Sequence, residues 1–112
     1  MKLAFAVLAV VVSSIAPVAA APPNYPQLAA DAVRAALRDP SSVRDAMRTP
    51  PFEGYFGTVN VCVRMNAKNA FGGYTGPQVV VVMFKGDRVK LVPDTNPGCD
   101  KYGWKPFVEL TR

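Results

Sequence analysis

Residues 58–65 read Thr-Val-Asn-Val-Cys-Val-Arg-Met, and their alternation of apolar and polar side chains decides the fold. A period of two is typical of a strand with one buried and one exposed face. The apolar set is Val59, Val61, Val63 and Met65. Because Cys62 lies on the opposite face, a segment bonded to it has to cross that face or run along the edge of the sheet.

Three more segments complete an antiparallel sheet around this strand. Residues 79–84 are apolar without a break, which predicts a central strand covered on both faces. Gly86 and Asp87 form the centre of a tight hairpin, from which a half-exposed strand continues to Pro93. A first strand near residues 44–49 is expected at the edge, where the prolines that follow it are tolerated.

A helix precedes the sheet. From Leu28 to Leu37 the apolar residues recur at helical spacing and form one stripe. The helix is expected to end at Asp39, because the residue before a proline avoids the α region. Residues 21–26 form a proline-rich lead-in, and residues 27–112 form a single small α+β domain in which residues 52–57 are a linker.

The C-terminal tail, residues 94–112, carries too much apolar area to be left in water. Its large apolar residues are Tyr102, Trp104, Phe107 and Leu110. We expect Cys99 to pin this tail to the second sheet face, with Trp104 buried beneath it. The predicted fold is α+β, with one N-terminal helix packed on a three- to four-stranded antiparallel sheet and a C-terminal tail pinned by a disulfide.

The two cysteines, Cys62 and Cys99, predict that disulfide. An even cysteine count in a small exported protein is typical of a structural bond. A redox or metal pair has little support, because the chain has no Cys-x-x-Cys spacing and no histidine.

Residues 1–20 have the pattern of a secretory signal peptide. Lys2 supplies a positive charge, an apolar run follows, and small residues precede a cleavage site after Ala20. The alternative is an uncleaved membrane anchor, but Ser13, Ser14 and Pro17 argue against it. We expect a periplasmic or secreted protein with no stable membrane anchor after cleavage.

Residues that could carry chemistry are few. With no histidine there is no imidazole base, and Ser41 and Ser42 stand in a helix-cap context. The spacing of the carboxylates Glu53, Asp94, Asp100 and Glu109 nominates no acid–base pair. We therefore expect no catalytic residue, no metal site and no cofactor. Removing Lys2 with the signal lowers the net charge from +5 to +4, and the basic residues are scattered, which argues against a nucleic acid partner.

The loop of residues 66–76, from Asn66 to Gly76, is the candidate binding site. It reads Asn-Ala-Lys-Asn-Ala-Phe-Gly-Gly-Tyr-Thr-Gly, and its glycines and asparagines predict a sharply folded loop. Aromatic rings beside polar donors suit a glycan, a peptide or a protein surface. The candidate binding residues are Lys68, Asn69, Phe71, Tyr74 and Thr75. The alternative is a self-packed loop, in which the two aromatic rings fold back onto the sheet edge.

Residues 37–43, residues 61–63 and the 66–76 loop together resemble one group of sequences. The group consists of small, exported, uncharacterised proteobacterial proteins that share an NAKNAFGGYTG-type loop. The resemblance implies an envelope or periplasmic setting in a Gram-negative bacterium, and it carries no activity, substrate or cofactor. Arg38 departs from the pattern, since lysine is commoner there.

The expected function is that of a non-catalytic periplasmic or envelope binding module, in which the 66–76 loop contacts an envelope protein or a glycan. The alternative is an inhibitor or small hydrolase directed at cell-wall glycan.

Overall fold

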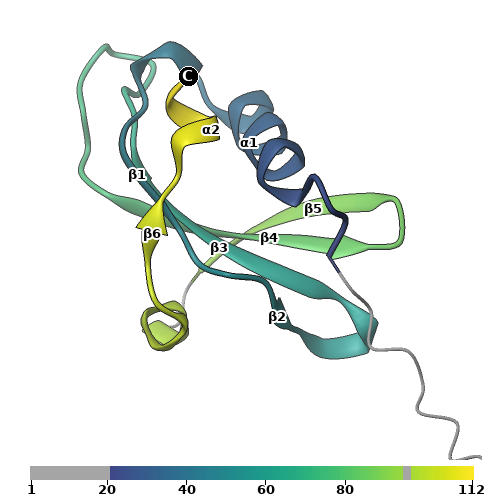
Figure 1. Cartoon of the computed structure of the whole chain (residues 1–112). Coiled ribbons are helices and arrows are strands. Elements are labelled where there is room, and N and C mark those ends of the chain that lie inside the picture. Colours follow the sequence, from purple (N-terminus) through teal and green to yellow (C-terminus); the bar gives the residue numbers. More distant parts are fainter. Residues whose placement is uncertain (1–20, 95–96) are drawn as a thin grey trace, which may run out of the picture.

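The computed structural model describes residues 21–94 and 97–112 (Figure 1). The signal peptide expected at residues 1–20 lies outside these residues. The helices and strands are α1 (Tyr25–Ala36), β1 (Arg44–Arg48), β2 (Phe52–Glu53), β3 (Val59–Asn66), β4 (Gln78–Lys85), β5 (Arg88–Pro93), β6 (Lys105–Pro106) and α2 (Val108–Thr111). Short 3₁₀ helices lie between them: η1 (Pro40–Ser42), η2 (Tyr55–Gly57) and η3 (Pro97–Tyr102).

β3 is the middle strand of an antiparallel sheet with the order β5-β4-β3-β1-β6. β2 also pairs with β3, on the same side as β1, and the two are separated by Pro50 and Pro51, which cannot donate to a strand ladder. The described residues thus form six strands rather than the expected three or four, because β2 and β6 have two residues each and no alternating pattern. The expectation that β1 is an edge strand is wrong, since β6 pairs with its outer side.

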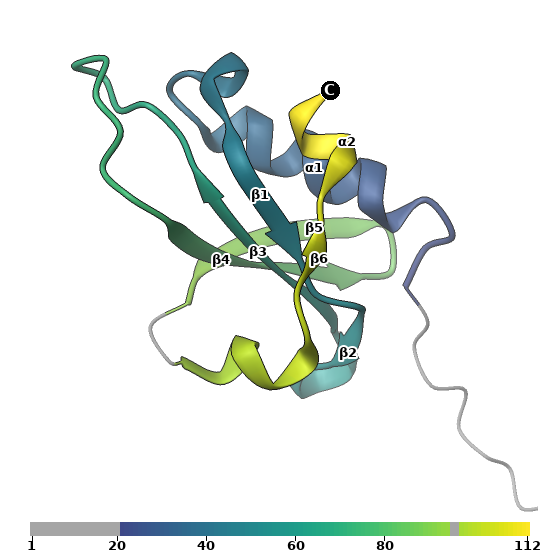
Figure 2. The same cartoon turned by 60° about the vertical axis from the view of Figure 1, so that its left-hand side comes forward.

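α1 covers one face of the sheet and forms the core with it (Figures 1 and 2). The buried residues of this contact are Ala29, Ala30 and Val33 on the helix and Val61, Val63, Met65, Val82 and Phe84 on the sheet. The helix begins at Tyr25, earlier than its apolar stripe, because proline is favoured in a first helical turn and Pro26 occupies it. The lead-in expected at residues 21–26 is therefore partly helical.

The predicted disulfide joins Cys62 on β3 to Cys99 on η3, with Cα atoms 6.0 Å apart. Both cysteines are buried. Figure 2 shows η3 and α1 on opposite sides of the sheet, as the alternation around Cys62 requires. The α+β class, the disulfide and the side on which it lies are confirmed.

The tail does not stay on the second face, and this part of the prediction is wrong. After η3 it pairs with β1 as β6, and α2 then lies beside α1 on the first face (Figure 2). Phe107 and Leu110 join the α1 core, and the Arg34 guanidinium donates hydrogen bonds to the carbonyl oxygens of Glu109 and Arg112. The tail thus wraps around one edge of the sheet, because its apolar residues are divided between the two faces.

Trp104 does not fill the core as expected. Its side chain is half-buried, and its indole Nε1 donates a hydrogen bond of 2.8 Å to Asp100. The Arg64 guanidinium lies 4.6 Å from the Trp104 ring centroid. The indole therefore rests on the second face at its margin.

The second face is only partly covered, in contrast to the expectation for β4. Val80 and Val82 point toward α1, whereas Val79, Val81 and Met83 point to the second face and remain half-buried. η3 crosses this face over Cys62, and a cleft beside it leaves part of the face open. None of the described helices has the length and apolar character that a membrane span requires.

We expect the double variant Cys62→Ala with Cys99→Ala to lower the free energy of unfolding by about 4 kcal/mol, because the bond closes a loop with a sequence separation of 37. Urea unfolding of the purified protein measures this change. Wild-type protein treated with a reductant is the control and should lose a similar amount. Alkylation of two free thiols in the oxidised wild-type protein would contradict the bond.

Replacement Phe107→Ala tests the path of the tail. Phe107 is 1% exposed, and truncating a buried phenylalanine costs about 3–5 kcal/mol of stability. The adjacent Val108 is 48% exposed, so Val108→Ala should change stability by less than about 0.5 kcal/mol. Equal effects of the two changes, measured by thermal or urea unfolding, would show that α2 does not pack on the first face.

Candidate functional site

The 66–76 loop extends the β3–β4 hairpin as a narrow, hydrogen-bonded turn. Lys68 and Tyr74 pair across it, and the Asn69 N–H donates to the Gly73 carbonyl at 2.9 Å. Asn69 Oδ1 accepts hydrogen bonds from the backbone N–H groups of Phe71 and Gly73, at 2.9 and 3.2 Å. Gly72 takes a φ of 79°, which a residue with a side chain rarely adopts. Asn69 therefore holds the turn together from inside.

Ser42 attaches the loop to the rest of the molecule. Its hydroxyl accepts a hydrogen bond from the Lys68 N–H at 2.8 Å, and its carbonyl oxygen accepts one from the Tyr74 hydroxyl at 2.8 Å. The Arg44 guanidinium lies 3.6 Å from the centroid of the Tyr74 ring, and Lys68 Nζ lies 5.7 Å from it. Tyr74 thus stabilises the loop by its hydroxyl and by cation–π contacts.

The candidate residues consequently have different surroundings. Phe71 is 96% exposed at the tip of the loop. Lys68, Asn69 and Tyr74 are half-buried and make the contacts described above. Thr75 is exposed, and its hydroxyl accepts a hydrogen bond from Gln78 at 3.5 Å. The structure brings Lys68 and Tyr74 together, whereas the Phe71 side chain lies in solvent.

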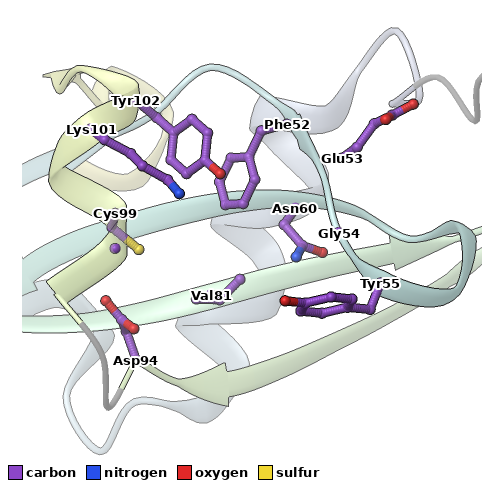
Figure 3. Close-up of a pocket in the computed structure, with 11 residues that line it drawn as sticks. Phe52, Glu53, Gly54, Tyr55, Asn60, Val81, Asp94, Cys99, Lys101 and Tyr102 are labelled. Atoms are coloured by element: carbon purple, nitrogen blue, oxygen red, sulfur yellow. The ribbon is translucent and has the colours of Figure 1, made fainter.

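A second surface is a cleft of about 550 Å³ on the open part of the second face (Figure 3). Asn60 on β3 and Val81 on β4 form its floor, β2 and η2 form one wall, and η3 forms the other. The lining residues are Phe52, Glu53, Gly54, Tyr55, Asn60, Val81, Asp94, Gly98, Cys99, Lys101 and Tyr102. The sequence alone does not reveal this cleft, because its lining residues come from five separate stretches of the chain. The aromatic residues of the expected linker, residues 52–57, are the sequence feature that could have indicated the cleft.

The two walls of the cleft are joined by aromatic stacking. The rings of Phe52 and Tyr102 have centroids 3.7 Å apart and an interplanar angle of 7°. Lys101 Nζ lies 5.1 Å from the Tyr102 centroid. Tyr55, at the rim, is 85% exposed, and its neighbour Phe56 is 90% exposed. The cleft therefore has one fixed aromatic wall and one free ring at its mouth.

Asn60 is the polar group at the floor of the cleft. Its Oδ1 atom is buried and has no hydrogen-bond donor among the described residues. Gly54 lies against its amide, since a Cβ at Gly54 would come within 2.3 Å of Asn60 Nδ2 and 2.4 Å of Thr58 Oγ1. The absence of a side chain at Gly54 thus leaves room for the Asn60 amide.

The two surfaces lie at opposite ends of β3. The 66–76 loop follows the last residue of β3, whereas η2 precedes its first residue (Figures 1 and 2). We compared the chain with models of known families, with curated proteins and with solved structures, and none of the three comparisons gave a match.

Two substitutions distinguish the role of Tyr74, which holds the loop in place, from that of Phe71, which is exposed at its tip. Tyr74→Phe removes the hydroxyl that bonds to Ser42 but keeps the ring beneath Arg44, and it should cost about 1 kcal/mol of stability. Phe71→Ala should change stability by less than about 0.5 kcal/mol, because the ring is in solvent. Urea unfolding measures both. A larger loss for Phe71→Ala than for Tyr74→Phe would mean that the tip packs on the protein.

Proposed function

We propose that this protein is a non-catalytic binding module of the bacterial envelope and that the 66–76 loop contacts a partner protein. The observation that carries the proposal is Phe71, which is 96% exposed on a loop held by the hydrogen bonds of Asn69 and Ser42. A single exposed apolar residue is common on protein surfaces. Phe71 differs because the loop that carries it is held in place by hydrogen bonds. Little conformational entropy of the loop would therefore be lost when the Phe71 ring inserts into a partner's pocket.

The chemistry around Phe71 indicates the kind of partner. Lys68 and Arg44 lie beside the Tyr74 ring below the tip, and Asp45 balances part of the Arg44 charge at 4.0 Å. A protein pocket that is apolar at its centre and acidic at its rim would complement this arrangement. Aromatic and arginine side chains are also the residue types that contribute most to protein interfaces.

An envelope location is part of the proposal. It is supported by the signal-like pattern of residues 1–20 and by the Cys62–Cys99 disulfide, since such bonds persist in oxidising compartments. The resemblance of the loop to exported proteobacterial proteins points to the same compartment.

Capture of partners from a periplasmic extract tests the function of the loop. We expect immobilised wild-type protein to retain a defined partner and Phe71→Ala to reduce its recovery about tenfold or more, as loss of an interface anchor does. Phe56→Ala is the matched control, because Phe56 is equally exposed at the other end of β3 and should leave recovery unchanged. Equal recovery by wild type and Phe71→Ala would contradict the proposal.

A further inference from the structure

We propose that the cleft between η2 and η3 binds a short uncharged oligosaccharide. This site is separate from the 66–76 loop, and the inference does not depend on the partner of that loop. The cleft is already built before a ligand binds. The disulfide fixes η3 above β3, and the Phe52–Tyr102 stack fixes β2 to η3, so a ligand would not have to order either wall.

The side chains of the cleft combine apolar surfaces with hydrogen-bonding groups, which is the combination that a sugar ring requires. Sugars present C–H groups on their faces and hydroxyl groups around their edges. The exposed Tyr55 ring and Val81 offer apolar surface, while the Asn60 amide and the Lys101 ammonium group offer hydrogen-bonding groups (Figure 3). The volume of about 550 Å³ lies within the usual range of ligand sites.

The Asn60 side-chain amide lies at the floor of the cleft and gives the ligand a polar group to bind. Its Oδ1 atom is buried without a donor, which costs stability, and rotation of the amide toward the cleft would let a ligand hydroxyl or acetamide N–H satisfy it. Figure 3 shows this amide between the Tyr55 ring and the Phe52–Tyr102 stack. An oligosaccharide in contact with Asn60 would therefore lie beside the aromatic rim.

Other ligand classes fit the cleft less well. Two carboxylates, Glu53 and Asp94, and one ammonium group, Lys101, line it, which disfavours an anionic ligand. An extended peptide cannot add to the sheet at Asn60, because β3 is paired there with β2 on one side and β4 on the other. The polar floor is unsuited to a lipid chain.

Titration of isotope-labelled protein with chitotetraose, and separately with cellotetraose, tests this site by NMR. We expect saturable shifts of backbone amides at residues 52–55, 60, 81 and 98–102, and none at residues 68–74. Tighter binding of chitotetraose would identify an acetamide group as the donor to Asn60, and equal binding would identify a hydroxyl. Absence of saturable shifts with both sugars at millimolar concentration, or shifts confined to the loop, would overturn the proposal.

Tyr55→Ala and Phe56→Ala form the matched pair of variants. Both side chains are at least 85% exposed, so the fold should tolerate either change, but only Tyr55 lines the cleft. We expect Tyr55→Ala to weaken oligosaccharide binding about fivefold or more and Phe56→Ala to leave the dissociation constant within about twofold. An equal loss in both variants would indicate non-specific stacking and overturn the assignment.

Cross-testing separates this proposal from the proposed function of the loop. Phe71→Ala should bind the oligosaccharide like the wild type, and Tyr55→Ala should capture the protein partner like the wild type. If neither sugar binds but the wild-type protein still captures a partner that Phe71→Ala loses, only the cleft proposal is contradicted. If a sugar binds at the cleft but no captured protein depends on Phe71, only the loop proposal is contradicted.

Discussion

The bond between Cys62 and Cys99 is the constraint on which the arrangement of the C-terminal half depends. A domain of this size buries only about 60% of the surface of its unfolded chain, so its apolar core gives a small margin of stability. The bond holds η3 on the second face, and the following residues then reach the outer side of β1 as β6. From there Phe107 enters the core beside α1. One covalent contact on the second face thereby directs packing on the first.

The core contains the aromatic rings of Phe84 and Phe107, while several other large aromatic rings stay outside it. Alanines and valines dominate the contact between α1 and the sheet. Tyr55 and Phe56 at one end of β3 and Phe71 at the other end are almost fully exposed. A chain selected only for stability would gain by placing such rings in its core. Their positions on exposed turns are the basis of the two binding surfaces proposed above.

The sequence pattern predicts the central part of this fold but contains no local signal for the rest. The alternation of residues 58–65 correctly assigns β3, its buried face and the side on which Cys62 is bonded, and Gly86 with Asp87 marks the hairpin. The path of the tail is harder to predict from the sequence, because β6 is two residues long. Nothing in the pattern of the tail indicates on which face of the sheet Phe107 is buried. Within the candidate site, the turn could be predicted from glycine and asparagine. The anchoring of Tyr74 to Ser42 joins residues too far apart in the chain for a local pattern.

The length of β3 has a consequence for how the two ends of the molecule are used. Eight residues of strand at about 3.3 Å each give a rise of about 26 Å, and β3 is paired with β4 from Val59 to Met65. The exposed rings that precede and follow β3 are therefore attached to opposite ends of one paired strand. Two large molecules, one at each end, would be kept apart by the length of β3, and tension between them would be carried by the covalent backbone of this strand.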